Sequence, residues 1–179
     1  IMSRSDTLLH SLTEYLNTER MDKILPILTG ESTISIRVIE WFVTNFCKKK
    51  NIAYIRKDKD NKELYFNVYL NYKAQLKSFS KKQFDPFCRR ERISFKYNDT
   101  DSVVTTVGQL NFFKWALQNG VVKYIENNYA EIEADMNCRN SSAKKKPTMQ
   151  KTRKKREELS ISATKSIKRE EVEIVVEFH

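Results

Sequence analysis

The spacing of apolar residues changes from helical to alternating and back again, and this order limits the folds open to the chain. In residues 32–51 apolar side chains recur every three or four positions, which predicts a buried helix. Residues 52–72 predict a short strand, a charged turn and a longer alternating strand over 64–71. From residue 106 the helical spacing returns. Helices, then strands, then helices predict an α+β domain with a small antiparallel sheet.

Local signals complete this order. The remaining predicted elements are helices over 5–18 and 21–30, a helix entry and loop over 73–92, strands over 92–97 and 101–107, and a helix pair over 106–119 and 121–137. Thr106 and Gln109 are spaced for a capping box at the start of that pair. Gly120 stands where the first of the two helices ends.

One hydrophobic core is expected from the most periodic segments. Large apolar side chains at their inward positions predict burial around a single centre, and the alternating segment adds its own row. The predicted core residues are Trp41, Phe42, Phe46, Leu64, Phe66, Val68, Phe113, Trp115 and Leu117.

Charge divides the chain into three parts. Residues 138–179 contain 12 Lys or Arg and 6 Asp or Glu, so they supply +6 of the net charge of +10. A stretch this charged cannot bury enough apolar surface to fold alone. We therefore predict an α+β globular domain over 1–137, a basic extended linker or tail over 138–171, and a C-terminal strand over 172–178.

The basic tail predicts an anionic partner. Between residues 139 and 156 there are nine Lys or Arg and no acid, a pattern that attracts phosphate backbones, acidic protein surfaces or anionic membranes. The candidate partner-binding residues of this basic tract are Lys144, Lys145, Lys146, Lys151, Arg153, Lys154, Lys155 and Arg156.

The last residues alternate strictly enough to predict a strand. Apolar side chains occupy every second position from 172 to 178, and an isolated strand must add to the edge of a sheet. The candidate strand-pairing residues are Val172, Ile174, Val176 and Phe178. The edge can belong to this chain or to a neighbour, and the sequence leaves both open.

A second basic stretch, residues 77–92, mixes cations with phenylalanines. Its candidate binding residues are Lys81, Lys82, Arg89, Arg90 and Arg92, and they are interleaved with Phe79, Phe84 and Phe87. Cations and aromatic rings together are typical of a nucleic-acid surface and also of a protein interface. Alternatively, the rings anchor a long connection to the core while the cations face water.

A helix-and-wing arrangement is another reading. Three helices followed by a hairpin resemble a winged helix, with Lys57, Lys59 and Lys62 on the wing. That reading needs the third helix to expose a polar recognition face. The segment from Ile36 to Phe46 is too apolar to favour it.

Signals for catalysis, metal and membrane insertion are weak. The two histidines and three separate cysteines form no ligand or nucleophile spacing, so we expect no enzyme activity, no cofactor and no metal. No run of 18 apolar residues occurs, so no transmembrane segment is expected.

Four segments resemble proteins of giant and other nucleocytoplasmic large DNA viruses. They are "IRVIEWFVTNFCKK", "FNVYLNYKAQLKSFSKKQFDPFCRRERI", "TTVGQLNFFKWALQNGVVKYI" and "LSISATKSIKREEVEIVVEFH", and the resemblance covers most of the chain from about Ile36. The members of that family are small and largely uncharacterised proteins. The resemblance implies a viral protein, made in a cytoplasmic factory or the host nucleus and carried in the virion. It brings no active-site residues.

Together these features predict a non-enzymatic virion structural protein. We expect a minor capsid or capsid-associated component, part of a larger assembly, whose basic tail laces to neighbouring virion proteins. The alternative is a protein that binds DNA or RNA in genome packaging or transcription.

Overall fold

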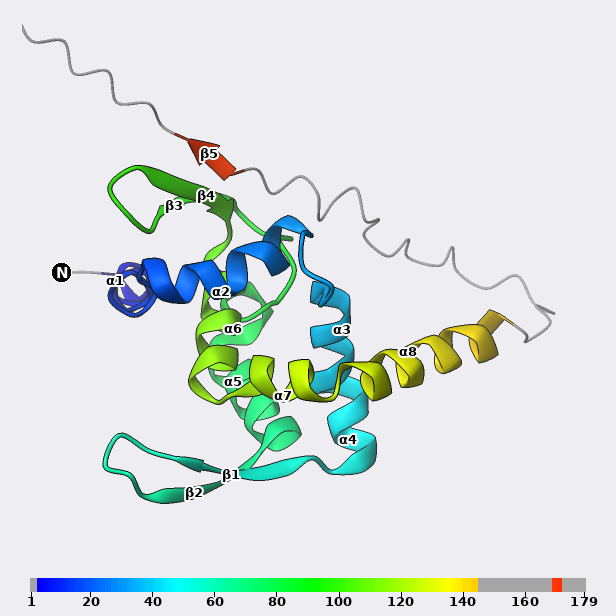
Figure 1. Cartoon of the computed structure of the whole chain (residues 1–179). Coiled ribbons are helices and arrows are strands. Elements are labelled where there is room, and N and C mark those ends of the chain that lie inside the picture. Colours follow the sequence, from blue (N-terminus) through cyan, green and yellow to red (C-terminus); the bar gives the residue numbers. More distant parts are fainter. Residues whose placement is uncertain (1–2, 145–168, 172–179) are drawn as a thin grey trace, which may run out of the picture.

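Helices form the centre of the molecule, and a small antiparallel sheet lies at each end (Figure 1). The computed structural model describes residues 3–144 and 169–171. Its architecture is α+β, as the order of apolar periods predicts. The strand-pairing positions 172–178 and the basic tract after Lys144 lie outside the described residues.

Two N-terminal helices are closed by local caps. Helix α1 (Arg4–Tyr15) begins after Ser3, whose hydroxyl accepts from the Asp6 backbone N–H while the Asp6 side chain accepts from the Ser3 backbone. Helix α2 (Thr18–Thr29) ends at Gly30, whose φ of 81° is easily reached without a Cβ. Both predicted helices are confirmed, although α1 ends earlier than the predicted 5–18.

The most apolar segment is a helix with a wider turn in its middle. It consists of α3 (Ile36–Trp41), the π-helical turn η1 (Phe42–Phe46) and α4 (Cys47–Lys50). Phe42, Val43 and Phe46 are all buried within the π-helical turn. The chain leaves α4 through Asn51, whose φ of 50° is left-handed.

A two-stranded ribbon follows. Strands β1 (Ala53–Lys57) and β2 (Glu63–Asn67) pair antiparallel, with Tyr54 opposite Phe66 and Ile55 opposite Tyr65. Side chains alternate between the two faces of a strand, so Tyr54 and Phe66 lie on the inner face and Ile55 and Tyr65 on the outer face.

The predicted extension of the second strand to residue 71 is wrong. Helix α5 (Val68–Gln83) begins directly after β2, and the Asn67 side chain accepts from the Leu70 backbone N–H at its first turn. Val68 and Tyr72 are four positions apart and are both buried. One apolar series therefore satisfied the strand spacing and the helix spacing at once.

The second sheet has three strands. Strand β3 (Ile93–Lys96) pairs with β4 (Asp101–Thr105), and β4 pairs on its other side with β5 (Arg169–Glu171). Both pairings are antiparallel, and the strand order is β3-β4-β5. The described strand β5 covers residues 169–171 and lies directly before the predicted strand over 172–178.

The predicted C-terminal helix pair is a set of three helices. They are α6 (Val107–Gln118), α7 (Val121–Asn127) and α8 (Tyr129–Lys144). Helix α8 continues past residue 137, so the first residues assigned to an extended tail, 138–144, are helical. Basic charge begins there, but charge alone does not end a helix whose earlier turns are packed on a core.

The capping box predicted at α6 is only half formed. The Thr106 hydroxyl accepts from the Gln109 backbone N–H at 3.1 Å. The Gln109 side chain instead accepts from the Thr105 hydroxyl and donates to the Pro86 carbonyl. Gln109 is fully buried, so it ties the 84–92 loop to the start of α6.

Most of the predicted core is confirmed. Phe42, Phe46, Phe66, Val68, Phe113 and Trp115 are buried in one cluster. Trp41 and Leu117 are partly buried against that cluster, and Leu64 is half-buried.

Neighbouring residues on β2 give a sharp test of this strand. Phe66 is 3% exposed, so Phe66→Ala should lower the free energy of unfolding by about 3–5 kcal/mol. Tyr65→Ala, on the outer face, should change it by less than about 1 kcal/mol. Chemical denaturation monitored by tryptophan fluorescence measures both. Equal losses in the two variants would show that the strand faces are assigned wrongly.

Candidate partner-binding surfaces

The 77–92 stretch, called here the basic segment, is held against the N-terminal part of α6 by hydrogen bonds. The Asn111 side chain donates to the Gln83 carbonyl at 2.8 Å, and the Asp85 backbone N–H donates to the Gly108 carbonyl at 3.2 Å. A Cβ on Gly108 would lie 3.3 Å from the Lys82 carbonyl oxygen. The absence of that Cβ lets the loop approach α6 closely, so the basic segment has a fixed position.

The aromatic rings of the basic segment face inward. Phe84 is 1% exposed, and its ring packs on Phe112 at 5.3 Å and on Trp115 at 5.6 Å. Phe79 and Phe87 are partly buried against the same core. Of the readings left open by the sequence, the structure shows the anchoring one. The Phe84 ring, which is buried, cannot stack on a nucleic-acid base.

Arg89 is engaged in an internal ion pair. Its Nε and one terminal nitrogen each donate to the Asp85 carboxylate at 2.9 Å. Asp85 is 5% exposed, and this pairing compensates for the burial of its charge. The hydrogen bond to Asp85 raises the pKa of Arg89, despite its partial burial. Arg89, one of the predicted binding residues, therefore stabilises the loop.

Glu40 of α3 lies near the Asp85–Arg89 pair, in surroundings that disfavour its negative charge. Burial raises the pKa of its carboxyl group, and the hydrogen bond from Thr44 and the charge of Arg89 only partly oppose that effect. A negative charge in this position is costly because it loses hydration.

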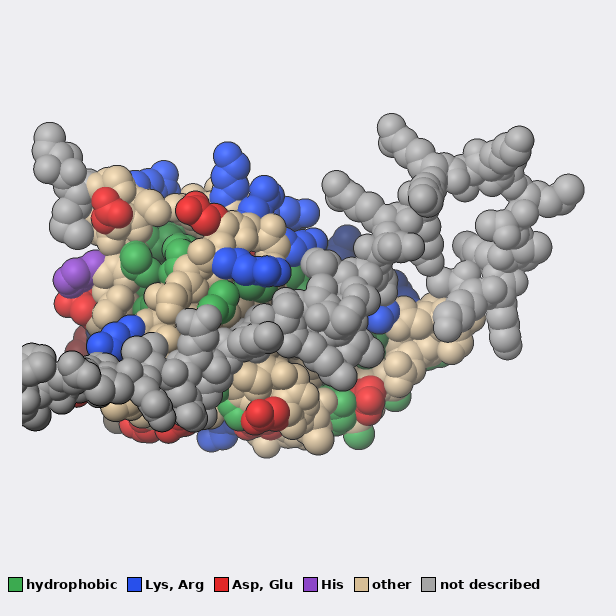
Figure 2. All heavy atoms as spheres, turned by 90° about the horizontal axis from the view of Figure 1, so that it is seen from above, with side chains coloured by type: hydrophobic (Ala, Val, Ile, Leu, Met, Phe, Trp, Pro, Cys, Tyr) green, Lys and Arg blue, Asp and Glu red, His purple; other side chains and the backbone are tan. Residues whose placement is uncertain are grey.

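The remaining cations of the basic segment are exposed. Lys81, Lys82, Arg90 and Arg92 all face solvent, and Lys77 joins Lys73 around a shallow hollow that Leu76 and Ala74 complete. In the view of Figure 2, most visible Lys and Arg side chains form one group, whereas Asp and Glu side chains are spaced apart. The structure thus brings all five predicted cations of this segment to the surface, and Arg89 is the one of them that is paired with Asp85.

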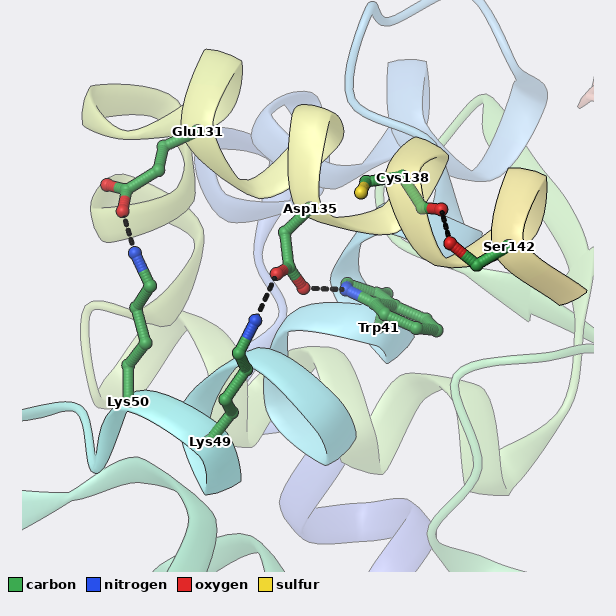
Figure 3. A network of polar contacts seen from close by, with 7 residues as sticks. All are labelled: Trp41, Lys49, Lys50, Glu131, Asp135, Cys138 and Ser142. Atoms are coloured by element: carbon green, nitrogen blue, oxygen red, sulfur yellow. Dashed lines mark hydrogen bonds and ion pairs between the residues drawn. The ribbon is translucent and has the colours of Figure 1, made fainter.

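Helix α8 carries the beginning of the basic tract away from the core. The Asp135 carboxylate accepts from Trp41 Nε1 at 3.0 Å and from Lys49 Nζ at 3.1 Å, and Glu131 pairs with Lys50 (Figure 3). Burial opposes ionisation of Asp135, but these two hydrogen bonds outweigh it and lower its pKa. Lys144 is the last residue of α8. The other seven residues of the basic tract lie outside the described residues.

The winged-helix reading is wrong. A recognition helix must leave one face free for a groove, but α3 and η1 contact both α5 and α8. Glu40 is partly buried beside the Asp85–Arg89 pair, and Trp41 is bonded to α8. The segment is an internal helix, as its apolar composition requires.

The outer face of the β1–β2 ribbon is a surface that the sequence did not indicate. Ile55 is 64% exposed, Tyr65 is 75% exposed, and the two lie opposite each other. Leu70, at the start of α5, is 65% exposed. The sequence does contain a signal for this surface, because the neighbours Tyr54–Ile55 and Tyr65–Phe66 put large apolar residues on both faces of the ribbon. A ribbon on a core can bury only one of them.

Within the residues that the structure describes, no three His, Cys, Asp or Glu side chains gather in a way that could hold a metal ion. None of the helices in those ranges is long and apolar enough to cross a membrane.

Comparison with known proteins places the chain in a family. Residues 7–178 match a family of unknown function, DUF7197. The chain belongs to this family. An alignment of 118 positions, which covers 63% of the chain, shows 46% identity to an uncharacterised protein of Acanthamoeba polyphaga mimivirus. The match covers 45% of that protein, and no solved structure matches the chain. The resemblance to giant-virus proteins is confirmed at this level.

Glu40 gives a pH prediction for the basic segment. Its pKa is raised above 4.5 in the folded chain, so folding binds a proton that is released as pH rises. Stability is therefore lost from about pH 4.5 upward, through the folded pKa. Glu40→Gln should remove this loss, so its melting temperature should exceed that of the wild type at pH 7 and converge with it near pH 4.

Glu14→Gln is the matched control, because the Glu14 side chain is 71% exposed. Differential scanning calorimetry across that pH range should show no comparable gain for it. A Glu40→Gln variant that follows the wild-type pH dependence would contradict the burial of the Glu40 carboxyl group.

Proposed function

We propose that the chain is a non-enzymatic structural component of a giant-virus particle, a minor capsid or capsid-associated protein. In this role it contacts neighbouring virion proteins through the outer face of the β1–β2 ribbon and through its basic tail. It is made in the cytoplasmic factory or nucleus of the host and incorporated there.

The observation that carries this proposal is the exposed cross-strand pair Ile55 and Tyr65. A cross-strand pair contributes little to the stability of a sheet, and these two apolar side chains are mostly exposed to water. Leu70, at the start of α5, is a further large apolar side chain that is mostly exposed. An apolar face on an element that projects from the body is typical of a protein contact. The giant-virus relative supports a viral setting but indicates no particular role.

The basic segment supports a second candidate, binding of DNA or RNA. Lys81, Lys82, Arg90 and Arg92 form an exposed basic surface that suits phosphate groups. Because the phenylalanines pack against the core, DNA or RNA would be bound through its phosphate charge and not through stacking on its bases. It should therefore be insensitive to sequence and strongly weakened by salt.

Protein composition of purified particles tests the first candidate. Particles of the virus that encodes this chain should contain it in stoichiometric amounts, and stepwise removal of the shell should release it with capsid proteins. Quantitative mass spectrometry of each fraction gives the result. Presence only in infected cells, and not in particles, would overturn the structural role. Release together with the genome would favour the second candidate.

Replacement of the basic tract tests how the chain contacts anions. Changing Lys144, Lys145, Lys146, Lys151, Arg153, Lys154, Lys155 and Arg156 to Gln should remove most salt-sensitive association with DNA, because the cations act together as a field. The melting temperature should stay unchanged.

The comparison variant changes Lys77, Lys81, Lys82, Arg90 and Arg92 to Gln and keeps Arg89, which pairs with Asp85. Electrophoretic mobility shifts at two salt concentrations should show that this variant retains most of the association. Full retention by the tract variant, with loss in the comparison variant, would move the anion site to the basic segment.

A further inference from the structure

We propose that the β1–β2 ribbon is the acceptor for residues 172–178 of a second copy of this chain, which add to it as a strand and link copies head to tail. The inference rests on the proposed structural function for its setting in the particle. The link itself is a property of the chain alone.

The ribbon offers both requirements of an acceptor. In the described part of the chain, neither β1 nor β2 has a second neighbouring strand, so each presents unpaired backbone groups along one edge. Beside those edges lie the exposed side chains of Ile55 and Tyr65. An added strand would bond to the backbone and place alternate apolar side chains in one row with this pair.

The register of β5 explains why residues 172–178 are available as the donor strand. Glu171 pairs with Asp101, the first residue of β4, and the strands run antiparallel. In this register β4 has no further residue to pair with the chain after Glu171. The next seven residues are the alternating run of Val172, Ile174, Val176 and Phe178, which needs a sheet edge that β4 does not supply.

The positions of the two sheets favour a second copy as the source. β5 lies on the sheet at one end of the molecule and the ribbon lies at the other end, with the helices between them (Figure 1). A segment that starts at β5 therefore meets the ribbon of another molecule more readily than its own ribbon. Donor and acceptor are different surfaces, so the contact is head to tail and extends into rows.

Charge does not oppose this pairing. The ribbon itself, residues 53–67, has four Lys or Arg and three Asp or Glu, a net charge of +1. The donor residues 172–178 have two Glu and no Lys or Arg, a net charge of −2. Pairing of two donor segments would bring like charges together, which disfavours it relative to pairing of a donor with a ribbon.

The experiment uses three forms of the full chain. One carries Ile55→Thr and Tyr65→Thr, which keep strand propensity but remove the apolar pair, so it can only donate. One carries Ile174→Lys and Val176→Lys, so it can only accept. The third, a matched control, carries Ser94→Thr and Lys96→Thr at exposed positions on β3.

Analytical ultracentrifugation from about 1 to 100 μM separates the outcomes, because this range brackets weak to moderate contacts. The wild type and the β3 control should form species larger than a dimer as concentration rises. Each blocked variant alone should stay monomeric. An equimolar mixture of the two should form a 1:1 dimer and nothing larger.

Three results would overturn the proposal. They are a monomeric wild type, a ribbon variant that assembles as the wild type does, and blocked variants that do not combine when mixed. Loss of assembly in the tail variant alone would assign the acceptor to another edge. None of these results bears on whether the chain is found in particles, so a failure here is separate from a failure of the proposed structural role.

Discussion

A cluster of aromatic rings between α5 and α6 supports the rest of the molecule. Tyr72, Phe84 and Phe112 meet Trp115 with ring centroids 5.6–6.0 Å from it, and all four residues are buried. Phe84 fixes the basic segment to this cluster, and Phe66 joins the ribbon to it through Trp115. Aromatic contacts of this kind add to the free energy of burial. Both candidate surfaces therefore take their position from one packing centre.

The ribbon shows how the same local sequence can serve the fold and a contact. Its inner face packs on the body, where the Tyr54 ring stacks on Tyr124 at 5.5 Å and its hydroxyl donates to the Asn119 carbonyl. Its outer face also carries large apolar side chains, and within the described part of the chain Ile55 and Tyr65 stay mostly exposed. A polar outer face would have sufficed for folding, so the exposed apolar residues are a cost that a binding partner would offset.

The fold class and much of the core could be predicted because burial imposes a period on the sequence. The end of β2 could not, since Phe66 and Val68 fit a strand while Val68 and Tyr72 fit a helix. The candidate surfaces could be predicted from the sequence only in part. Cations in the basic segment are visible in the sequence, but the inward rings and the Asp85–Arg89 pair depend on contacts with α6. Likewise, which ribbon face is covered depends on α7 and the distant Tyr124.

Cross-linking within intact particles tests the central claim most directly, that the ribbon is a contact surface of a structural component. Lys57, Lys59 and Lys62 are exposed at the free end of the ribbon and react with amine-specific reagents. The structural account predicts that they link to other polypeptides, or to other copies of the chain, more often than exposed Lys23 of α2 does. Ribbon lysines that link only within their own chain, in particles where Lys23 reaches neighbours, would contradict it.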